Sequence, residues 1–164
     1  MVDHEILLKK LKIYQYDENT VIWYTSYLSK RTQHVYKTNI LSEPGTIRCG
    51  APQGSILGQL LFILFINDHP LVLRDSKPSS YLYADDPTML EIQNTMQELK
   101  ISLQNALSKL DNWCTCNGMV VRTGKTKILL ISAQKKRTKL DNDELCLTWK
   151  DKRLQMAYHY SLLG

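Results

Sequence analysis

Two adjacent carboxylates, Asp85 and Asp86, follow a largely apolar run at 81–84 that is typical of a strand. Two carboxylates about 4 Å apart repel by about 4 kcal/mol at an effective dielectric near 20, and a divalent cation removes that cost. Mg²⁺ favours one or two protein carboxylates together with substrate phosphates. The pair therefore indicates a hard-metal site for phosphoryl transfer, although Asp-Asp-Pro would also serve as a plain turn between two strands.

A loop rich in glycine and proline stands upstream of this pair and runs into an apolar segment at 56–66. Gly50 and Gly54 allow backbone conformations that are closed to other residues, and Ser55 is a good helix N-cap. A helix that begins there would present free amides to an anion such as a phosphate. Loops of this kind often only lead into a helix. The interpretation that this loop binds a ligand therefore depends on the carboxylate pair that follows.

Taken together, these segments resemble the reverse transcriptases of non-LTR retrotransposons. Residues 50–68 are similar to that family's motif B, and Tyr-Ala-Asp-Asp at 83–86 is similar to its motif C. Residues 2–11 resemble the helix after motif A, 113–127 resemble motif D, and 163–164 resemble the start of motif E. The resemblance implies one partial reverse transcriptase domain over the whole chain, with the fingers and the thumb missing.

The resemblance also implies roles for individual residues. Asp85 would be the metal ligand of motif C and Asp86 the weaker second carboxylate, so the implied cofactor is Mg²⁺ or Mn²⁺. Lys125 of motif D would neutralise or protonate the leaving pyrophosphate. The residues implied in binding nucleotide, primer end and template are Pro52, Gln53, Gly54, Ser55, Tyr83 and Ala84. The implied partners are an RNA template, a DNA primer and deoxynucleoside triphosphates.

One acid of the family's catalytic set has no counterpart in this sequence. Motif A carries a metal-binding aspartate on a strand just before the segment at 2–11, and the sequence begins with Met1 where that strand would have ended. Asp3 is not a substitute, because it is expected to cap the helix that begins near His4. Two hypotheses follow. The chain is a reverse transcriptase domain whose parent activity is two-metal nucleotidyl transfer, or it is a catalytically inactive remnant that at most binds nucleic acid. A metal-dependent nuclease would also need a third acid and gains nothing from the glycine-rich loop.

Apolar periodicity predicts an α+β fold of packed helices and hairpins. The expected helices are 4–15, 18–29, 55–73 and 95–116, and the expected strands are 31–39, 46–49 (after a turn at 42–45), 80–84, 88–92, 127–132, 145–149 and 154–160. The resemblance makes this a partial polymerase palm with flanking helices, in the split β-α-β, ferredoxin-like layout.

The motif-A strand would be absent from the centre of that sheet. Residues 88–92 and 127–132 would then have unpaired edges, which must pair with each other, pair with another chain in self-association, or aggregate. Pro87 stands where the family usually has threonine or serine, and it removes a backbone N–H at the start of the returning strand. That loss costs about 1 kcal/mol if a ladder partner is left unpaired.

Composition adds broad constraints. Lys and Arg number 21 against 16 Asp and Glu, and the net charge of +5 suits a polyanionic partner. The densest basic run, at 135–139, would contact a nucleic-acid backbone or form a solvated loop. The four cysteines, which show no paired metal spacing, are Cys49, Cys114, Cys116 and Cys146. Reduced thiols and the lack of the ~20 apolar residues needed to span a bilayer predict an intracellular protein without a membrane partner.

Overall fold

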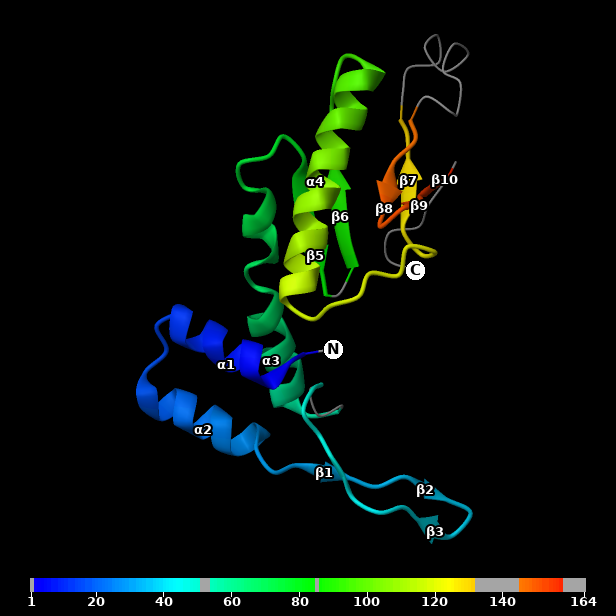
Figure 1. Cartoon of the computed structure of the whole chain (residues 1–164). Coiled ribbons are helices and arrows are strands. Elements are labelled where there is room, and N and C mark those ends of the chain that lie inside the picture. The colour runs from blue at the N-terminus through cyan, green and yellow to red at the C-terminus, as the bar shows by residue number, and fades with distance from the viewer. Residues whose placement is uncertain (1, 51–53, 85, 132–144, 158–164) are drawn as a thin grey trace. The chain divides into compact units, whose positions relative to one another are not determined.

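The computed structural model describes residues 2–50, 54–84, 86–131 and 145–157 and divides the chain into two compact units (Figure 1). Unit 1 comprises Met1–Asp68 with Asn117–Met119, and unit 2 comprises His69–Cys116 with Val120–Gly164. Within the described residues there are four α-helices, one 3₁₀ helix and several short two-stranded sheets. The predicted mixed α+β class is therefore confirmed.

Helices α1 (His4–Ile13) and α2 (Glu18–Leu28) open unit 1 and pack on each other. The Asp3 carboxylate accepts a hydrogen bond from the amide of Ile6 at 3.0 Å, so the predicted N-cap is confirmed. Both helices end within two residues of their predicted C-terminal ends, 15 and 29.

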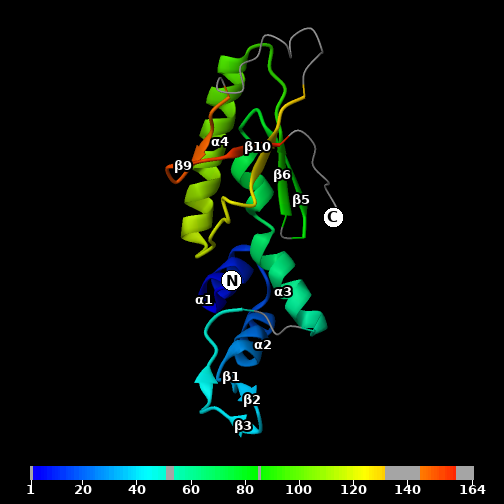
Figure 2. The same cartoon turned by 90° about the vertical axis from the view of Figure 1, so that its right-hand side faces the viewer.

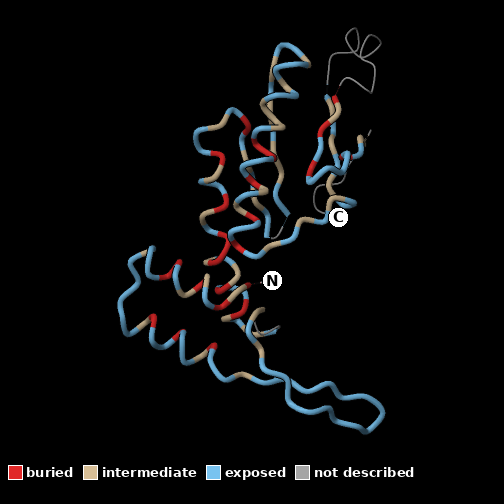
Figure 3. Tube along the Cα trace, viewed as in Figure 1, coloured by how far each residue is buried: buried red, intermediate tan, exposed pale blue. Residues whose placement is uncertain are grey.

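An exposed two-stranded ribbon, Thr32–Thr46, follows α2 (Figure 3). Strand β1 (Thr32–Gln33) pairs with β4 (Gly45–Thr46), and β2 (Tyr36–Lys37) pairs with β3 (Ile40–Leu41), both antiparallel. Every side chain in the ribbon is exposed.

The ribbon turns at a different place from the predicted one. The prediction put the turn at 42–45, but the chain reverses at Thr38 and Asn39, whose φ angles are +50° and +61°. A two-residue turn with both φ angles positive matches the right-handed twist of a hairpin, and asparagine tolerates that conformation better than most residues. The predicted partner strand at 46–49 is confirmed only at its start, where Thr46 pairs with Thr32 and the amide of Ile47 donates to the carbonyl of Arg31. The strand predicted at 31–39 is shortened and interrupted.

Helix α3 (Ile56–Ile66) comes next in unit 1. The Ser55 hydroxyl accepts a hydrogen bond from the amide of Gly58 at 2.9 Å, which confirms Ser55 as the cap. The prediction of one helix through residue 73 is wrong, because α3 ends at Ile66 and a separate 3₁₀ helix, η1 (His69–Leu73), begins unit 2. Pro70 explains the break, because it has no amide to donate to the carbonyl of Ile66, the residue at which α3 ends.

A buried lysine joins α1 to the end of α3. The Lys10 ammonium forms an ion pair with Asp68 at 2.6 Å and donates to the carbonyl of Phe65 at 2.7 Å. Burial lowers the pKa of Lys10, and the carboxylate of Asp68 opposes that shift. The largest fully buried side chains among the described residues also come from these two helices, and they are Phe65, Leu7, Leu11 and Leu61.

In unit 2, β5 (Ser79–Tyr83) and β6 (Asp86–Leu90) form an antiparallel hairpin close to the predicted one. Helix α4 (Met96–Cys116) agrees with the predicted helix at 95–116, and Gly118 follows it at φ +61°. Its buried side chains are Ala106, Leu107, Leu110 and Cys114. Both β5 and α4 pack against η1, so the hairpin has a packed base (Figure 2).

The end of unit 2 contains two further sheets. Strands β8 (Thr148–Trp149) and β9 (Lys152–Arg153) form a hairpin, with its turn at 150–151 as predicted. The strand predicted at 154–160 does not extend this hairpin, because β10 (Gln155–Ala157) pairs in parallel with β7 (Lys127–Leu129). The hairpin prediction was therefore right about the turn and wrong about the length of the arms, within the described residues.

Strands β6 and β7 each pair on one side only in the part of the chain that the structure describes. β6 pairs with β5 and β7 pairs with β10, which leaves the other edge of each strand open. The apolar side chains of Leu90, Ile92, Leu129 and Ile131 are exposed on or beside these strands. Within the described residues the strands form separate two-stranded sheets, and the prediction that these edges pair with each other or with another chain stays a prediction.

The stretch Ile56–Leu73 has a mean hydropathy of 1.7 over 18 residues, so its length and composition alone would allow it to cross a membrane. Core helices of soluble proteins pass the same test, and α3 itself has 11 residues, fewer than the ~20 needed to span a bilayer. The interruption after Ile66 and the burial of Leu61 and Phe65 fit a core helix.

Candidate functional site

The tip of the β5–β6 hairpin carries three of the predicted site residues. Tyr83 pairs directly with Asp86, and Ala84 follows Tyr83 with a φ of +51°. The Tyr83 side chain is 68% exposed, and Ala84 and Asp86 are exposed as well. Asp85, the predicted metal ligand, lies outside the described residues. The structure thus brings Tyr83, Ala84 and Asp86 together at one accessible end of a hairpin with a packed base.

Pro87 fits this hairpin without loss of a ladder bond. The register pairs Tyr83 with Asp86 and Leu82 with Pro87. Hydrogen-bonded and non-hydrogen-bonded pairs alternate in an antiparallel ladder, and the pair that closes a tight hairpin is a hydrogen-bonded one, so the Leu82–Pro87 pair is expected to exchange no backbone hydrogen bond. The position where Pro87 lacks an N–H therefore faces the open edge of β6. The expected cost of about 1 kcal/mol does not arise within the hairpin, because no partner on β5 is left unpaired.

A hard divalent cation suits the donor chemistry of this tip. Asp86 offers an exposed carboxylate, and its neighbour in the sequence is a second aspartate. Carboxylate oxygens are the protein ligands that Mg²⁺ prefers, and it completes its shell with water and phosphate oxygens. Among the described residues, no group of three or more His, Cys, Asp and Glu side chains lies close enough to hold a metal ion.

The glycine-rich loop lies in unit 1, where Gly54 and Ser55 are described. Gly54 has a φ of +77°, which side-chain-bearing residues rarely adopt, while a Cβ added there would meet nothing within 4 Å. The glycine is therefore required by its backbone conformation and not by crowding. Ser55 caps α3, and Pro52 and Gln53 lie outside the described residues.

The start of this loop is tied to the segment before α1. The His4 ring nitrogen Nε2 lies 2.7 Å from the carbonyl oxygen of Gly50, and the amide of Gly50 donates to the carbonyl of Val2 at 2.6 Å. Asp3 and Cys49 form an antiparallel bridge beside these bonds. Sequence reasoning missed this anchor, because no local pattern connects residues that are 46 positions apart.

Lys125, the predicted motif-D lysine, lies in unit 2 on an exposed turn just before β7. Its amide donates to the carbonyl of Arg122 at 2.9 Å, which closes the turn. The basic run predicted at 135–139 lies outside the described residues. The predicted site residues are therefore divided between the units, with Gly54 and Ser55 in unit 1 and the hairpin tip and Lys125 in unit 2.

An exposed aspartate at a hairpin tip, next to a second aspartate in the sequence, and a glycine loop before a capped helix are features of enzymes that transfer phosphoryl or nucleotidyl groups. The model of the family "Reverse transcriptase (RNA-dependent DNA polymerase)" matches residues 1–158. The chain belongs to the reverse transcriptase family. Members of that family use divalent metal ions and bind a nucleic-acid template and primer.

A curated relative adds detail to this assignment. The chain is 38% identical over 94 residues to a "Probable RNA-directed DNA polymerase from transposon BS" of Drosophila melanogaster. The aligned part is 54% of this chain and 10% of the Drosophila protein, so the chain corresponds to a small part of that relative. The similarity to a transposon polymerase agrees with the resemblance that the motifs imply.

Proposed function

We propose that this chain is part of the catalytic palm of a retrotransposon reverse transcriptase, covering motifs B to D and the start of motif E. The parent reaction is the transfer of a nucleotide to a primer 3′-hydroxyl on an RNA template. The observation that carries the proposal is the exposed hairpin tip formed by Tyr83, Ala84 and Asp86 in a chain of this family.

Each residue has a proposed role at the chemical step. Asp85 and Asp86 would hold the Mg²⁺ or Mn²⁺, which supplies charge neutralisation for the reacting phosphates. Tyr83 and Ala84 would border the primer end and the incoming deoxynucleoside triphosphate. Lys125 would neutralise or protonate the leaving pyrophosphate.

The glycine-rich loop has a binding role in this proposal. Gly54 and Ser55, together with Pro52 and Gln53, would contact the nucleotide and the template. The positive φ of Gly54 supports this role, because a loop without side-chain bulk at that point lets a ligand approach the main chain. The hydrogen bonds that Gly50 makes with the His4 ring and with the carbonyl of Val2 would hold the start of the loop in place.

A second candidate is that the 164-residue polypeptide by itself binds nucleic acid without adding nucleotides. In the described part of the chain β6 and β7 each have one unpaired edge, with Leu90 and Leu129 exposed, and this favours the second candidate. In the family, the strand that carries the motif-A aspartate runs between the corresponding strands. A polypeptide without that strand would lack an acid that the two-metal reaction needs. Its open edges would also favour self-association.

Primer extension on poly(rA) primed with oligo(dT), with Mg²⁺ or Mn²⁺, tests both candidates. The assay compares the 164-residue chain with the same chain lengthened at both ends by the fingers, the aspartate-bearing motif-A strand and the thumb of a family member. We expect extension from the lengthened chain and none from the chain alone. Extension by the chain alone would contradict the second candidate.

Two matched variants of the lengthened chain identify the residues responsible. Asp85→Ala removes the proposed metal ligand and should abolish extension. Asp75→Ala removes an exposed carboxylate elsewhere in unit 2 and should leave extension unchanged. Equal activity of both variants would overturn the proposed role of the hairpin tip.

A further inference from the structure

Unit 1 carries a row of stacked side chains that the proposed catalytic site does not use. The rings of Trp23 and Tyr27 on α2 lie 5.8 Å apart between centroids and are nearly parallel, at 8°. The guanidinium carbon of Arg31 lies 5.0 Å from the centroid of the Tyr27 ring. We call Trp23, Tyr27 and Arg31 the stacked row. Its outer member, Trp23, is 52% exposed.

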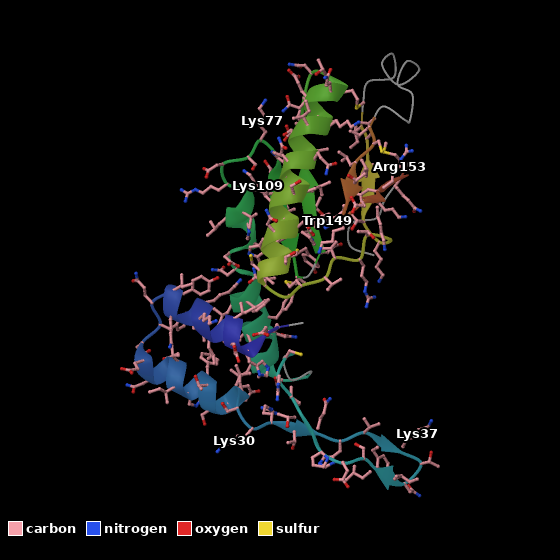
Figure 4. All side chains as sticks on the ribbon, viewed as in Figure 1. Lys30, Lys37, Lys77, Lys109, Trp149 and Arg153 are labelled. Atoms are coloured by element: carbon pink, nitrogen blue, oxygen red, sulfur yellow. The ribbon has the colours of Figure 1, made fainter. Side chains whose placement is uncertain are left out.

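The stacked row leads directly into the ribbon, Thr32–Thr46. Arg31 precedes β1, and its carbonyl accepts a hydrogen bond from the amide of Ile47 at 2.9 Å, which closes the base of the ribbon. Lys30 lies where α2 meets the ribbon, and Lys37 lies near the ribbon's far end (Figure 4). The two features therefore form one continuous surface within unit 1.

This surface carries an excess of positive charge. Residues 30–48 contain Lys30, Arg31, Lys37 and Arg48 against the single carboxylate of Glu43. These 19 residues thus carry a net charge of +3 out of the +5 of the whole chain. Such a concentration attracts a polyanion and gives an association that depends on salt.

The ribbon also exposes apolar and aromatic groups that a packed protein would bury. Tyr36 is 68% exposed, Ile40 is 72% exposed, and Val35 and Leu41 are exposed as well. An isolated two-stranded ribbon in water is at best marginally stable, so its order would increase when a partner covers it. The partner must therefore offer both negative charge and flat apolar faces.

We propose that the stacked row and the ribbon bind a single strand of nucleic acid. Unpaired bases would stack on Trp23, and the phosphates would follow the cationic ribbon from Arg31 toward Lys37. A duplex fits less well, because its base faces are already stacked. This inference rests on the proposed function, since a polymerase must hold an unpaired template strand, and it assigns that contact to residues outside motifs B, C and D.

Fluorescence anisotropy with labelled U20, dT20 and a 20-base-pair duplex tests the inference on the whole 164-residue chain. We expect tighter binding of either single strand than of the duplex, and the comparison of U20 with dT20 separates RNA from DNA. Trp23→Ala should weaken single-strand binding about fivefold or more, as loss of one stacking contact does. Ile22→Ala, an equally exposed neighbour on α2, is the matched control and should bind as the parent does.

Salt dependence tests the ribbon separately. Removing Lys37 and Arg48 together, as Lys37→Gln with Arg48→Gln, should lower the slope of log affinity against log salt by about 0.7 for each lost phosphate contact. Lys77→Gln with Lys109→Gln in unit 2 removes the same charge and should leave the slope unchanged. Circular dichroism of each variant verifies that the helices remain folded, and Trp23→Phe, which keeps a stacking ring, should retain most of the binding.

The outcomes separate this inference from the proposed function. Single-strand binding that is unchanged in Trp23→Ala and in the ribbon variant would overturn the inference while leaving the catalytic proposal intact. Concentration-dependent dimers that the ribbon variant abolishes, without binding of any strand, would identify a second copy of the chain as the partner and would also overturn it. Loss of primer extension in Asp85→Ala with normal strand binding would support both proposals.

Discussion

The ribbon in unit 1 and the β5–β6 hairpin in unit 2 are built alike and supported differently. Both are antiparallel, and both reverse through residues with positive φ, Thr38 and Asn39 in the ribbon and Ala84 in the hairpin. No side chain of the ribbon is buried, whereas the hairpin has half-buried side chains on both strands and packs on η1. Since an isolated ribbon is marginally stable, the packed base is what fixes the hairpin in one conformation.

This difference matches the different tasks we propose. Metal-assisted transfer needs carboxylates held within a fraction of an ångström of the reacting phosphates, so Asp86 must stand on a rigid element. Binding a single strand by stacking and charge tolerates small displacements, because each base and each phosphate offers the same contact. An unpacked ribbon can therefore serve as a binding surface but could not position a catalytic residue without its ligand.

The largest effect is expected for Leu73→Ala, which removes a buried side chain from the helix that supports the β5–β6 hairpin. Leu73 is 3% exposed in η1, the element on which β5 and α4 both pack. We expect a loss of about 2–4 kcal/mol in the free energy of unfolding of unit 2, from lost burial and the cavity left behind. Urea titration followed by tryptophan fluorescence measures this change.

Ile40→Ala in the ribbon is the matched control for Leu73→Ala. Ile40 is 72% exposed, so its truncation should change stability by less than about 0.5 kcal/mol. Equal losses in the two variants would mean that the ribbon has a packed base as well, and the contrast between the two hairpins would not hold.

His4→Ala tests how the trailing end of the ribbon is anchored. The ring of His4 is buried and bonds the carbonyl of Gly50, so its removal leaves that acceptor unpaired and should cost about 1 kcal/mol. The amides of Ile47 and Gly50 should exchange faster with solvent, while those at 79–90 should not change. His34→Ala removes a similar but exposed bond, from the ring of His34 to Ser42, and should have little effect. Faster amide exchange at 79–90 would mean that the His4–Gly50 bond also affects the β5–β6 hairpin, contrary to this prediction.

The elements with strong local signals could be predicted from the sequence. Ser55 and Asp3 were recognised as caps because a hydroxyl or carboxylate before an apolar helix can satisfy a free amide. Helix α4 was predicted within one residue because its apolar side chains recur at helical spacing over 21 residues. The hairpin tip was located because Asp85 and Asp86 follow an apolar strand.

Features that depend on distant contacts could not be predicted in this way. The residue types at 42–45 favour a turn more strongly than Thr38 and Asn39 do. The chain nevertheless reverses at Thr38 and Asn39, because β1 pairs with β4 across the ribbon. The parallel pairing of β10 with β7 joins strands that no periodicity connects. The hydrogen bond between His4 and Gly50 likewise could not be predicted, because it joins residues 46 positions apart.

Ala84→Gly and Asn39→Gly compare the two turns directly. Alanine pays about 1–2 kcal/mol for a left-handed conformation, and glycine avoids that cost but loses more entropy on folding. We expect Ala84→Gly to stabilise the β5–β6 hairpin by about 0.5 kcal/mol. Asn39→Gly should change little, because asparagine already tolerates its φ of +61°. Thermal melts of the two variants measure the difference, and a larger gain at Asn39 would show that the ribbon turn is the more strained.

Pro87→Thr should have the smallest effect on the monomer and the most specific effect on association. Its N–H would face the open edge of β6, so threonine adds no bond within the hairpin and should change the free energy of unfolding by less than about 0.5 kcal/mol. A strand that pairs on that edge would gain one hydrogen bond, worth about 0.5–1.5 kcal/mol, so self-association should strengthen a few-fold. Sedimentation velocity over a concentration series measures this, and Pro44→Thr in the ribbon is the matched control. Stronger association of both variants, or of neither, would mean that the open edge of β6 is not the surface through which copies meet.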